Sequence, residues 1–452
     1  MSEVTVVRGG LVWTGSDAVP GDVVITDGVI TSLTGDTPAD VTRTIDAADS
    51  LVLPGLINSH VHPGGSPLLR GIAEDNPMPG PGALYHNTVD FRLITWEHLR
   101  PDEIESLVAW EAVQMLLGGA TTIISEQVGD IDPWVSVASR LGFRTDVGRI
   151  YPYPPHIANG AEISGKSYDA VLEGMQAGFE LFERFEGALD GRLTLHLAPH
   201  APNTVPTQIL IESAELARKR NARLHLHISQ HPSENQTVRS RTGLSPVRYL
   251  DDIGFLGSDV LATHLTYTDA RDWDVLARTG TNVVHCGSRK AREAVTSPFL
   301  ELLDRGVNVC LATETYSHDL VDELKWSALL AKLRAARVDR PDAKDMIAAV
   351  TIAPALALGR SDLGVLRAGA RGDVTVVGLD GPFNSPAFDA ARNLVYYSRA
   401  SNVRHSLVDG LPVVADGEVA GVDMAQLRHE VRAACRRVWQ IANDLGHVEW
   451  RA

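Results

Sequence analysis

Two histidines one residue apart, His60 and His62, stand at the end of a short apolar segment, 56–60 (LINSH). In an extended strand, residues i and i+2 point to the same side, so both imidazoles can face one divalent ion. Neutral imidazole is a common ligand of zinc and also suits iron. A lone His-x-His pair is weak evidence, because histidines also occur as ordinary core residues. Its position at a strand end, just after Pro54-Gly55, favours a metal site.

Other histidines follow the same pattern. Of the sixteen in the chain, six more lie at or near the ends of strand-like segments: His196, His200, His225, His227, His264 and His285. Each alone is explained more simply as a satisfied core or surface histidine. Their recurrence at separate strand ends instead favours a shared site. A catalytic metal needs about three protein ligands and an open position for water.

Strand-like and helix-like segments alternate from about residue 54 to residue 360. The strand-like segments are 56–60, 121–125, 193–198, 223–228, 260–264, 282–286 and 307–312. The helix-like segments include 103–117, 169–186, 207–220, 269–279 and 321–337. Alternating β and α elements predict a parallel sheet in an α/β fold, and their number favours a closed (β/α)8 barrel over an open sheet. Such barrels place their chemistry at the C-terminal ends of the strands, where these histidines stand.

Both chain ends carry short β-branched segments. They are 4–7, 22–26, 29–33, 44–46, 51–53, 373–377, 394–397, 403–408 and 411–414. The N-terminal strands alone are too few to bury a core. We therefore expect both chain ends to build one small β-sandwich beside the barrel. Helical spacing of apolar residues over 424–442 predicts an amphipathic terminal helix. The expected divisions are 1–53 and 361–420 for the sandwich, 54–360 for the barrel, and 421–452 for the helix.

Composition excludes several classes of protein. The 452 residues include 41 Lys and Arg against 57 Asp and Glu, a net charge of −16, which argues against a nucleic-acid partner. No segment approaches the roughly 18 apolar residues of a membrane span, and the N-terminus lacks the pattern of a secretory signal. The three cysteines, Cys286, Cys310 and Cys435, are far apart and have no CxxC spacing. They indicate reduced thiols, so we expect a cytoplasmic protein. Because no apolar segment is long enough to span a membrane, we also expect no membrane partner.

The segment Val52–Leu69, VLPGLINSHVHPGGSPLL, resembles the first barrel strand of the amidohydrolase superfamily. It is most similar to the chlorohydrolase and aminohydrolase branch, which includes cytosine-, guanine-, adenosylhomocysteine- and triazine-type hydrolases. Further matching motifs follow in order along nearly the whole chain: Gly119–Thr122, His200–Pro202, His227, His264, Val284–Cys286, Leu311–Glu314, Leu363-Gly364, Gly369–Val374 and Val408–Gly410. These motifs are specific for the superfamily and not for a substrate.

The resemblance implies a metal-dependent hydrolase with a TIM barrel that cleaves a C–N bond of a nitrogen-rich, cyclic small molecule, by deamination or by amidine or amide hydrolysis. His60, His62 and His227 resemble the family's metal ligands on the first and fifth strands. His264 resembles the sixth-strand histidine that polarises the attacking water or the substrate. Glu314 stands where the family has an aspartate that ligates the metal and takes the proton from the water.

The resemblance also assigns His200, Gln230 and His285 to substrate binding. The fourth strand, RLTLHLAPH, has no lysine nearby, so the carbamylated-lysine bridge of two-metal relatives is absent. We therefore expect one divalent ion, with zinc favoured over iron or manganese. Relatives of this architecture are commonly oligomeric, which makes a homodimer the default expectation.

Two departures from the family pattern affect proton transfer. The fifth-strand motif His-x-x-Glu becomes His227-Ile-Ser-Gln230, and glutamine cannot titrate in this range. Proton transfer there must be lost or supplied by His231, Glu234, His264 or the substrate. Glu314 adds one methylene, which moves its carboxylate by about 1.5 Å unless the backbone retreats. Metal geometry tolerates less than that, so either the strand end is remodelled or Glu314 leaves the metal.

These departures leave two alternatives to a C–N hydrolase. One is a hydrolytic dehalogenase, whose leaving group needs little protonation. The other is a barrel that performs a non-hydrolytic reaction or only binds a ligand. Arg289 and Lys290 are interpreted either as a solvated loop pair or as a clamp for a substrate carboxylate or phosphate. The Pro- and Gly-rich segment 74–90, with Tyr85 and His86, is interpreted either as a lid over the site or as a surface loop.

Overall fold

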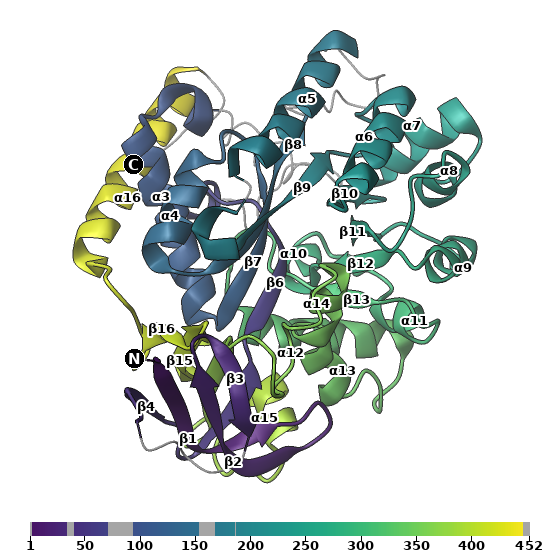
Figure 1. The fold of residues 1–452 in the computed structure, drawn as a ribbon. Coiled ribbons are helices and arrows are strands. Elements are labelled where there is room, and N and C mark those ends of the chain that lie inside the picture. The colour runs from purple at the N-terminus through teal and green to yellow at the C-terminus, as the bar shows by residue number, and fades with distance from the viewer. Residues whose placement is uncertain (1, 34–39, 71–93, 153–167, 186, 446–452) are drawn as a thin grey trace.

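The computed structural model describes residues 2–33, 40–70, 94–152, 168–185 and 187–445, and the segment 74–90 lies outside them. Figure 1 shows an eight-stranded parallel barrel beside a mixed sheet to which both ends of the chain contribute. The predicted TIM barrel with a flanking β unit is therefore confirmed. Among the described helices, none has the length and apolar character needed to cross a membrane.

The barrel strands run in chain order around the barrel. They are β6 (Leu56–Val61), β7 (Ala120–Gln127), β8 (Arg144–Tyr151), β9 (Leu193–Pro199), β10 (Arg223–Ile228), β11 (Val260–His264), β12 (Asn282–His285) and β13 (Val309–Leu311). Neighbouring strands pair in parallel, and a bridge between Val61 and Glu314 brings the last strand end to the first. The chain between β13 and the next helix thus lies beside His60 and His62.

Helices cover the outside of the barrel. The longer ones are α3 (Pro101–Leu117), α4 (Asp132–Leu141), α5 (Tyr168–Phe185), α6 (Thr207–Lys219), α7 (Pro232–Thr242), α9 (Ala270–Thr279) and α12 (Leu320–Ala335). Short helices follow several strands: α1 (Ser66–Leu69), α8 (Pro246–Asp252), α10 (Gly287–Ala291), α11 (Phe299–Leu303), α13 (Ala343–Ala348) and α14 (Ile352–Ala357). Their apolar faces form one large core with the strands. Burial of this apolar area is the main source of stability.

The chain ends form one nine-stranded sheet with its own apolar core. Its strands are β1 (Val4–Trp13), β2 (Ala18–Thr26), β3 (Val29–Leu33), β4 (Arg43–Asp46), β5 (Ser50–Pro54), β14 (Val374–Gly378), β15 (Val403–Val408), β16 (Leu411–Ala415) and β17 (Glu418–Val419). Helix α16 (Met424–Asp444) packs against α3 at the left of Figure 1, as the apolar spacing predicts.

One predicted strand is wrong. Residues 394–397 (LVYY) belong to helix α15 (Ala390–Tyr397). Asp389 caps this helix by accepting a hydrogen bond from the backbone N–H of Arg392. The helix buries Leu394 and Val395 and packs against α12 and α13. Capping and tertiary packing therefore outweigh the β propensity of this short segment.

Buried ion pairs fix the sheet against the bottom of the barrel. Arg144, at the start of β8, donates to both carboxylate oxygens of Asp373 at 3.0 and 3.1 Å and to Asp409 at 2.9 Å. Thr375 of β14 also donates to the carbonyl of Gly119 at 2.8 Å. The sheet thus lies at the end of the barrel opposite the histidines. These contacts orient the barrel and contribute nothing to the site directly.

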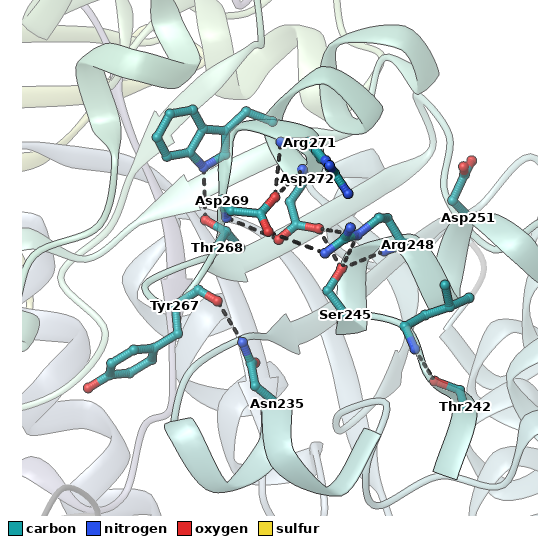
Figure 2. Close-up of polar contacts among 12 residues, drawn as sticks. Asn235, Thr242, Ser245, Arg248, Asp251, Tyr267, Thr268, Asp269, Arg271 and Asp272 are labelled. Atoms are coloured by element: carbon teal, nitrogen blue, oxygen red, sulfur yellow. Dashed lines mark hydrogen bonds and ion pairs between the residues drawn. The ribbon is translucent and has the colours of Figure 1, made fainter. Parts of the chain in front are cut away.

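A second polar cluster holds the helices that follow β10 and β11 (Figure 2). Arg248 donates from Nε to Ser245 at 2.8 Å and to Asp272 at 3.1 Å, and its Nη2 lies 3.3 Å from Asp269. Asn235 of α7 donates to the carbonyl of Tyr267 at 2.6 Å. These contacts tie α7, α8 and α9 together and steady the loops after the strand ends that carry His227 and His264.

Candidate metal centre and active site

His62 and His227 face each other through their Nε2 atoms at 3.1 Å. Each Nδ1 lies 3.0 Å from a backbone carbonyl oxygen, that of Glu126 for His62 and that of His200 for His227. A carbonyl only accepts, so each Nδ1 carries the proton and each Nε2 presents a lone pair. Two lone pairs at this distance repel each other unless a cation lies between them. The donor geometry therefore fits a metal ion held by two neutral imidazoles.

His60 completes the imidazole set. Its ring centroid lies 4.5 Å from that of His62 and 5.0 Å from that of His227. Ligand atoms of these three residues and of Glu126 all lie within 4.8 Å of one another, and all four residues are buried. The structure thus brings together the three predicted histidine ligands from β6 and β10.

Glu126 was not identified from the sequence. It lies near the end of β7, with 1% of its surface exposed. Burial, and then the nearby charge of Glu314, raise the pKa of the Glu126 carboxyl. The only signal in the sequence is a polar pair, Glu126-Gln127, directly after the apolar run of that strand.

His264 and Glu314 lie on the other side of His60. Ligand atoms of these three residues again lie within 4.8 Å of one another. Burial, followed by the charge of Lys290, lowers the pKa of His264 well below its usual value. The backbone is strained here, because His264 has φ +83° and Glu314 has φ +57°. Positive φ at residues with a Cβ is concentrated at functional sites.

The Glu314 carboxylate makes a second contact that the sequence did not suggest. Its Oε2 lies 2.9 Å from Nε of Arg289 and also accepts from the Thr315 hydroxyl. Nη1 of the same guanidinium lies 2.6 Å from Glu293, and Arg289 lies over the Tyr316 ring at 5.3 Å. The longer side chain of glutamate is therefore held by an arginine while it still reaches His60 and His264.

Neither interpretation of Arg289 and Lys290 matches the structure. Both side chains are buried, with 1% and 0% exposed, so they are not a solvated loop pair. Lys290 lies 2.9 Å from Glu293 and donates to the carbonyl of Gln230 at 3.3 Å. Since both cations already have carboxylate partners, they are not an open clamp for a substrate anion. Their positive charge is used inside the protein.

The predicted substrate-binding residues lie in different surroundings. The His200 ring lies 5.1 Å from that of His227, and its Nδ1 contacts the Thr204 hydroxyl at 2.9 Å. The His285 ring packs against Phe299 with centroids 5.3 Å apart, and burial lowers its pKa to about 4. Gln230 is buried at the end of the fifth strand. The structure therefore brings His200 to the histidine cluster and places His285 against the core.

Glu234, one of the candidates to replace the missing glutamate, braces the backbone. Its two oxygens accept from the N–H groups of Ser229 and Gln230 at 2.6 and 2.8 Å. Burial raises its pKa to about 7. These contacts support the turn at Ser229, whose φ is +51°. His264, in contrast, belongs to the cluster around His60.

The charge balance of this centre also fits a metal ion. Two buried carboxylates, Glu126 and Glu314, lie close enough for one to raise the pKa of the other. The nearby histidines His200, His225 and His264 are neutral, because burial lowers their pKa values well below 6.5. Neutral imidazoles are ligands, and a divalent ion offsets the carboxylate charge.

Comparison with known proteins gives the family. The sequence profile of the amidohydrolase family matches residues 51–413. The chain belongs to the amidohydrolase family. It is 31% identical over 438 residues to a 5'-deoxyadenosine deaminase of Methanosarcina mazei, covering 93% of this chain and 94% of that protein. It is also 31% identical over 460 residues to a 5-methylthioadenosine/S-adenosylhomocysteine deaminase of Halobacterium salinarum, covering 99% and 100%.

Solved structures agree on the fold of this amidohydrolase. An adenosine deaminase from Xanthomonas campestris with bound zinc superposes with a TM-score of 0.85 at 24% identity, covering 96% of this chain and 98% of that one. An atrazine chlorohydrolase from Arthrobacter aurescens complexed with zinc gives a TM-score of 0.83 at 24% identity, covering 95% and 100%. The family match and the 31% identical relatives confirm the predicted superfamily, and these structures agree with it in fold.

The protein is a metal-dependent hydrolase that acts on carbon–nitrogen bonds other than peptide bonds. The family and the named relatives favour this prediction over a barrel that only binds a ligand. The predicted divalent-metal cofactor is supported by the buried histidine and glutamate cluster.

Proposed function

We propose that this amidohydrolase is a zinc-dependent deaminase of an adenosine-like nucleoside. It would hydrolyse the bond between the purine ring and its exocyclic amino group and release ammonia. The observation that carries the proposal is the pair of opposed Nε2 atoms of His62 and His227, which needs a cation. The substrate class is supported by the relatives named as 5'-deoxyadenosine and methylthioadenosine/S-adenosylhomocysteine deaminases.

His60, His62 and His227 would hold the ion through Nε2. A divalent ion at such a site supplies a nucleophile at neutral pH by lowering the pKa of water. Glu314 accepts the proton of the attacking water. We assign that proton to Oε1, because Oε2 forms the ion pair with Arg289 and accepts from the Thr315 hydroxyl. Addition of water to the ring carbon gives a tetrahedral intermediate, and Glu314 passes the proton that it accepted to the adjacent ring nitrogen. The intermediate collapses as its hydroxyl proton passes through Glu314 to the amino group, which leaves as ammonia.

The remaining predicted residues orient the reaction. His264 steadies the oxygen that attacks, since it belongs to the same cluster as His60 and Glu314. His200 is proposed to contact the substrate beside His227. The Gln230 side chain donates or accepts hydrogen bonds with the ring and transfers no proton. His285, whose ring packs against Phe299, is proposed to bind substrate as the resemblance implies.

The test is a substrate panel on zinc-loaded protein. Adenosine, 5'-deoxyadenosine, 5'-methylthioadenosine and S-adenosylhomocysteine are compared with guanine, cytosine and atrazine, and release of ammonia and of chloride is followed separately. We expect ammonia and the spectral change from an aminopurine to a hydroxypurine with at least one adenosine-like compound. Zinc-loaded protein that deaminates no aminopurine would reject the proposed substrate class.

Gln230 favours one second candidate, a hydrolase whose leaving group needs no proton, such as a halide. The variant Gln230→Glu restores the carboxylate that the family usually has. If the protein is a deaminase limited by proton delivery, this change raises its rate of ammonia release. If it is a dehalogenase, chloride release from atrazine is seen in the native protein, and ammonia release stays absent in both proteins.

We also propose a cytoplasmic homodimer. Cys286, Cys310 and Cys435 are free thiols, as expected in a reducing compartment. Helix α12 exposes Leu333 at 79%, and the segment before α15 exposes Phe388 at 96%, so apolar surface is available for a second copy. Light scattering of the purified chain gives the mass directly, and a monomer at micromolar concentration would reject the dimer.

A further inference from the structure

Behind the three histidine ligands, a fourth histidine of the barrel interior contacts one of them. His225 lies two residues before His227 on β10 and is completely buried. Its Nε2 lies 3.1 Å from Nδ1 of His60 and 2.8 Å from the Thr263 hydroxyl. On the opposite side of the ring, Nδ1 lies 3.7 Å from Oε1 of Glu126. The contact with His60 is the feature of interest, because it involves a proposed metal ligand.

The positions of the ring protons determine which histidine donates and which accepts in this contact. A His60 ring that binds an ion through Nε2 must carry its proton on Nδ1. That N–H points at Nε2 of His225, which must therefore accept and leave the His225 proton on Nδ1. Within the described residues, His225 Nδ1 and both Glu126 oxygens are buried without a hydrogen-bond partner. A buried donor and a buried acceptor thus face each other, slightly beyond hydrogen-bond length.

We propose that Glu126 and His225 are positioning residues that orient His60 for the metal. The chain of contacts runs from the Glu126 carboxylate to His225, from His225 to His60, and from His60 to the ion. A carboxylate that orients a metal-bound histidine is a common arrangement, and here a second imidazole lengthens it. The inference rests on the proposed role of His60 as a ligand.

The same residues suggest a rival site. Ligand atoms of Glu126, His196 and His225 lie within 4.8 Å of one another and could hold a second ion. An ion on His225 Nδ1 would move that ring's proton to Nε2, where it would meet the His60 N–H at 3.1 Å. Two donors at that distance repel each other. Occupation of the second site is therefore incompatible with His60 as a ligand, and we expect one ion per chain.

The experiment measures zinc affinity by competition with a chelator, which requires no substrate. His225→Met fills the space but removes the acceptor, and loss of such a partner weakens metal binding about 10- to 100-fold. His225→Gln places an amide oxygen near the position of Nε2, so it should retain most of the affinity. Glu126→Gln keeps the shape and removes the charge, and is expected to weaken binding less than His225→Met.

Two controls separate orientation from general damage. Leu261→Ala creates a cavity in neighbouring β11, lowers the melting temperature and should leave zinc affinity unchanged. The visible spectrum of the cobalt-substituted protein should change in His225→Met and resemble the native spectrum in His225→Gln. If His225→Met does not fold, the test relies on Glu126→Gln, through its zinc affinity and the visible spectrum of its cobalt-substituted form.

Zinc affinity equal to the native value in both His225→Met and Glu126→Gln would overturn the proposal. Two zinc ions per native chain would also overturn it, in favour of the rival site. If the native protein binds one zinc and the variants weaken it while no aminopurine is deaminated, the proposed substrate fails and this inference stands.

Discussion

The histidine half and the carboxylate half of the site are built differently. His60, His62 and His227 sit on or directly beside barrel strands, and the Nδ1 atoms of His62 and His227 contact backbone carbonyls. Glu314 and Arg289 follow strand ends, and Glu314 has a left-handed backbone. One half is thus fixed by the sheet itself, and the other is fixed by side-chain ion pairs.

This difference separates two tasks. The strand-borne histidines are proposed to define where an ion binds, and the rings of His62 and His227 are oriented by backbone carbonyls. The carboxylate half is proposed to control how a proton moves, and it depends on the side-chain ion pairs of Arg289, Lys290 and Glu293. The departures from the family motifs, Gln230 and Glu314, accordingly lie at or beyond strand ends.

The largest effect is expected from the histidine half. His227→Ala removes one of the two opposed Nε2 atoms, so zinc content should fall below one ion per ten chains and activity should disappear. Zinc analysis of the purified variant checks the first expectation. His98→Ala is the matched control, because His98 lies before α3, and it should keep both zinc and activity. A His227→Ala protein that still binds one zinc ion per chain would contradict the assignment of metal binding to the histidine half.

Glu314→Gln should affect the reaction and spare the ion. The amide cannot accept the proton from water, and loss of a general base costs about 10²- to 10⁴-fold in rate. Zinc content should stay near one per chain if the histidines alone bind the ion tightly. Steady-state kinetics and zinc analysis on one preparation distinguish these outcomes, and loss of zinc would show that Glu314 is a ligand of comparable weight.

Arg289→Met tests the ion pairs that hold the carboxylate half. Removing one partner of a buried pair costs about 3–5 kcal/mol in stability, because the remaining carboxylates stay buried. We expect a lower melting temperature and a lower kcat, with zinc affinity close to the native value if the histidines alone bind the ion. Arg289→Lys keeps the charge and serves as the control. Unchanged stability in Arg289→Met would mean that the pair with Glu314 does not form.

The smallest effect is expected in the pH dependence of stability. It comes from Glu323, a buried residue of α12 beside the carboxylate half. It accepts from the backbone N–H of Ser288 at 3.1 Å, and burial raises its pKa from 4.5 to about 7. A raised carboxyl pKa favours folding below about pH 4.5, and that contribution is lost as pH rises through 7. Glu323→Gln should therefore gain up to about 3 kcal/mol relative to the native protein between pH 5 and pH 8.

Chemical denaturation of the native protein and Glu323→Gln at the two pH values gives that difference. A stability difference that does not change with pH would show that Glu323 titrates at its ordinary value.

The barrel could be predicted because most of its strands carry an apolar run and alternate with helix-like segments. β8 was missed, since RTDVGRIY contains Arg144 and Asp146, which look like loop residues until their partners are known. Those partners, Asp373 and His196, lie far away in the sequence. LVYY was predicted as a strand because the cap at Asp389 and the packing against α12 are not visible in four residues.

The site was predictable where it depends on strand ends. Spacing and resemblance pointed to His60, His62 and His227, and the structure brings these three together because the barrel gathers parallel strand ends. Glu126 was not found, and the burial of Arg289 and Lys290 was not expected. Their roles depend on which side chains meet inside the barrel, and no local pattern encodes such a meeting.

Zinc-soaked crystals, measured at the zinc absorption edge, test the central claim most directly. The account predicts one anomalous peak per chain, about 2.0–2.1 Å from Nε2 of His60, His62 and His227. A peak bound instead by Glu126, His196 and His225, or no peak at zinc concentrations that saturate the protein in solution, would contradict it.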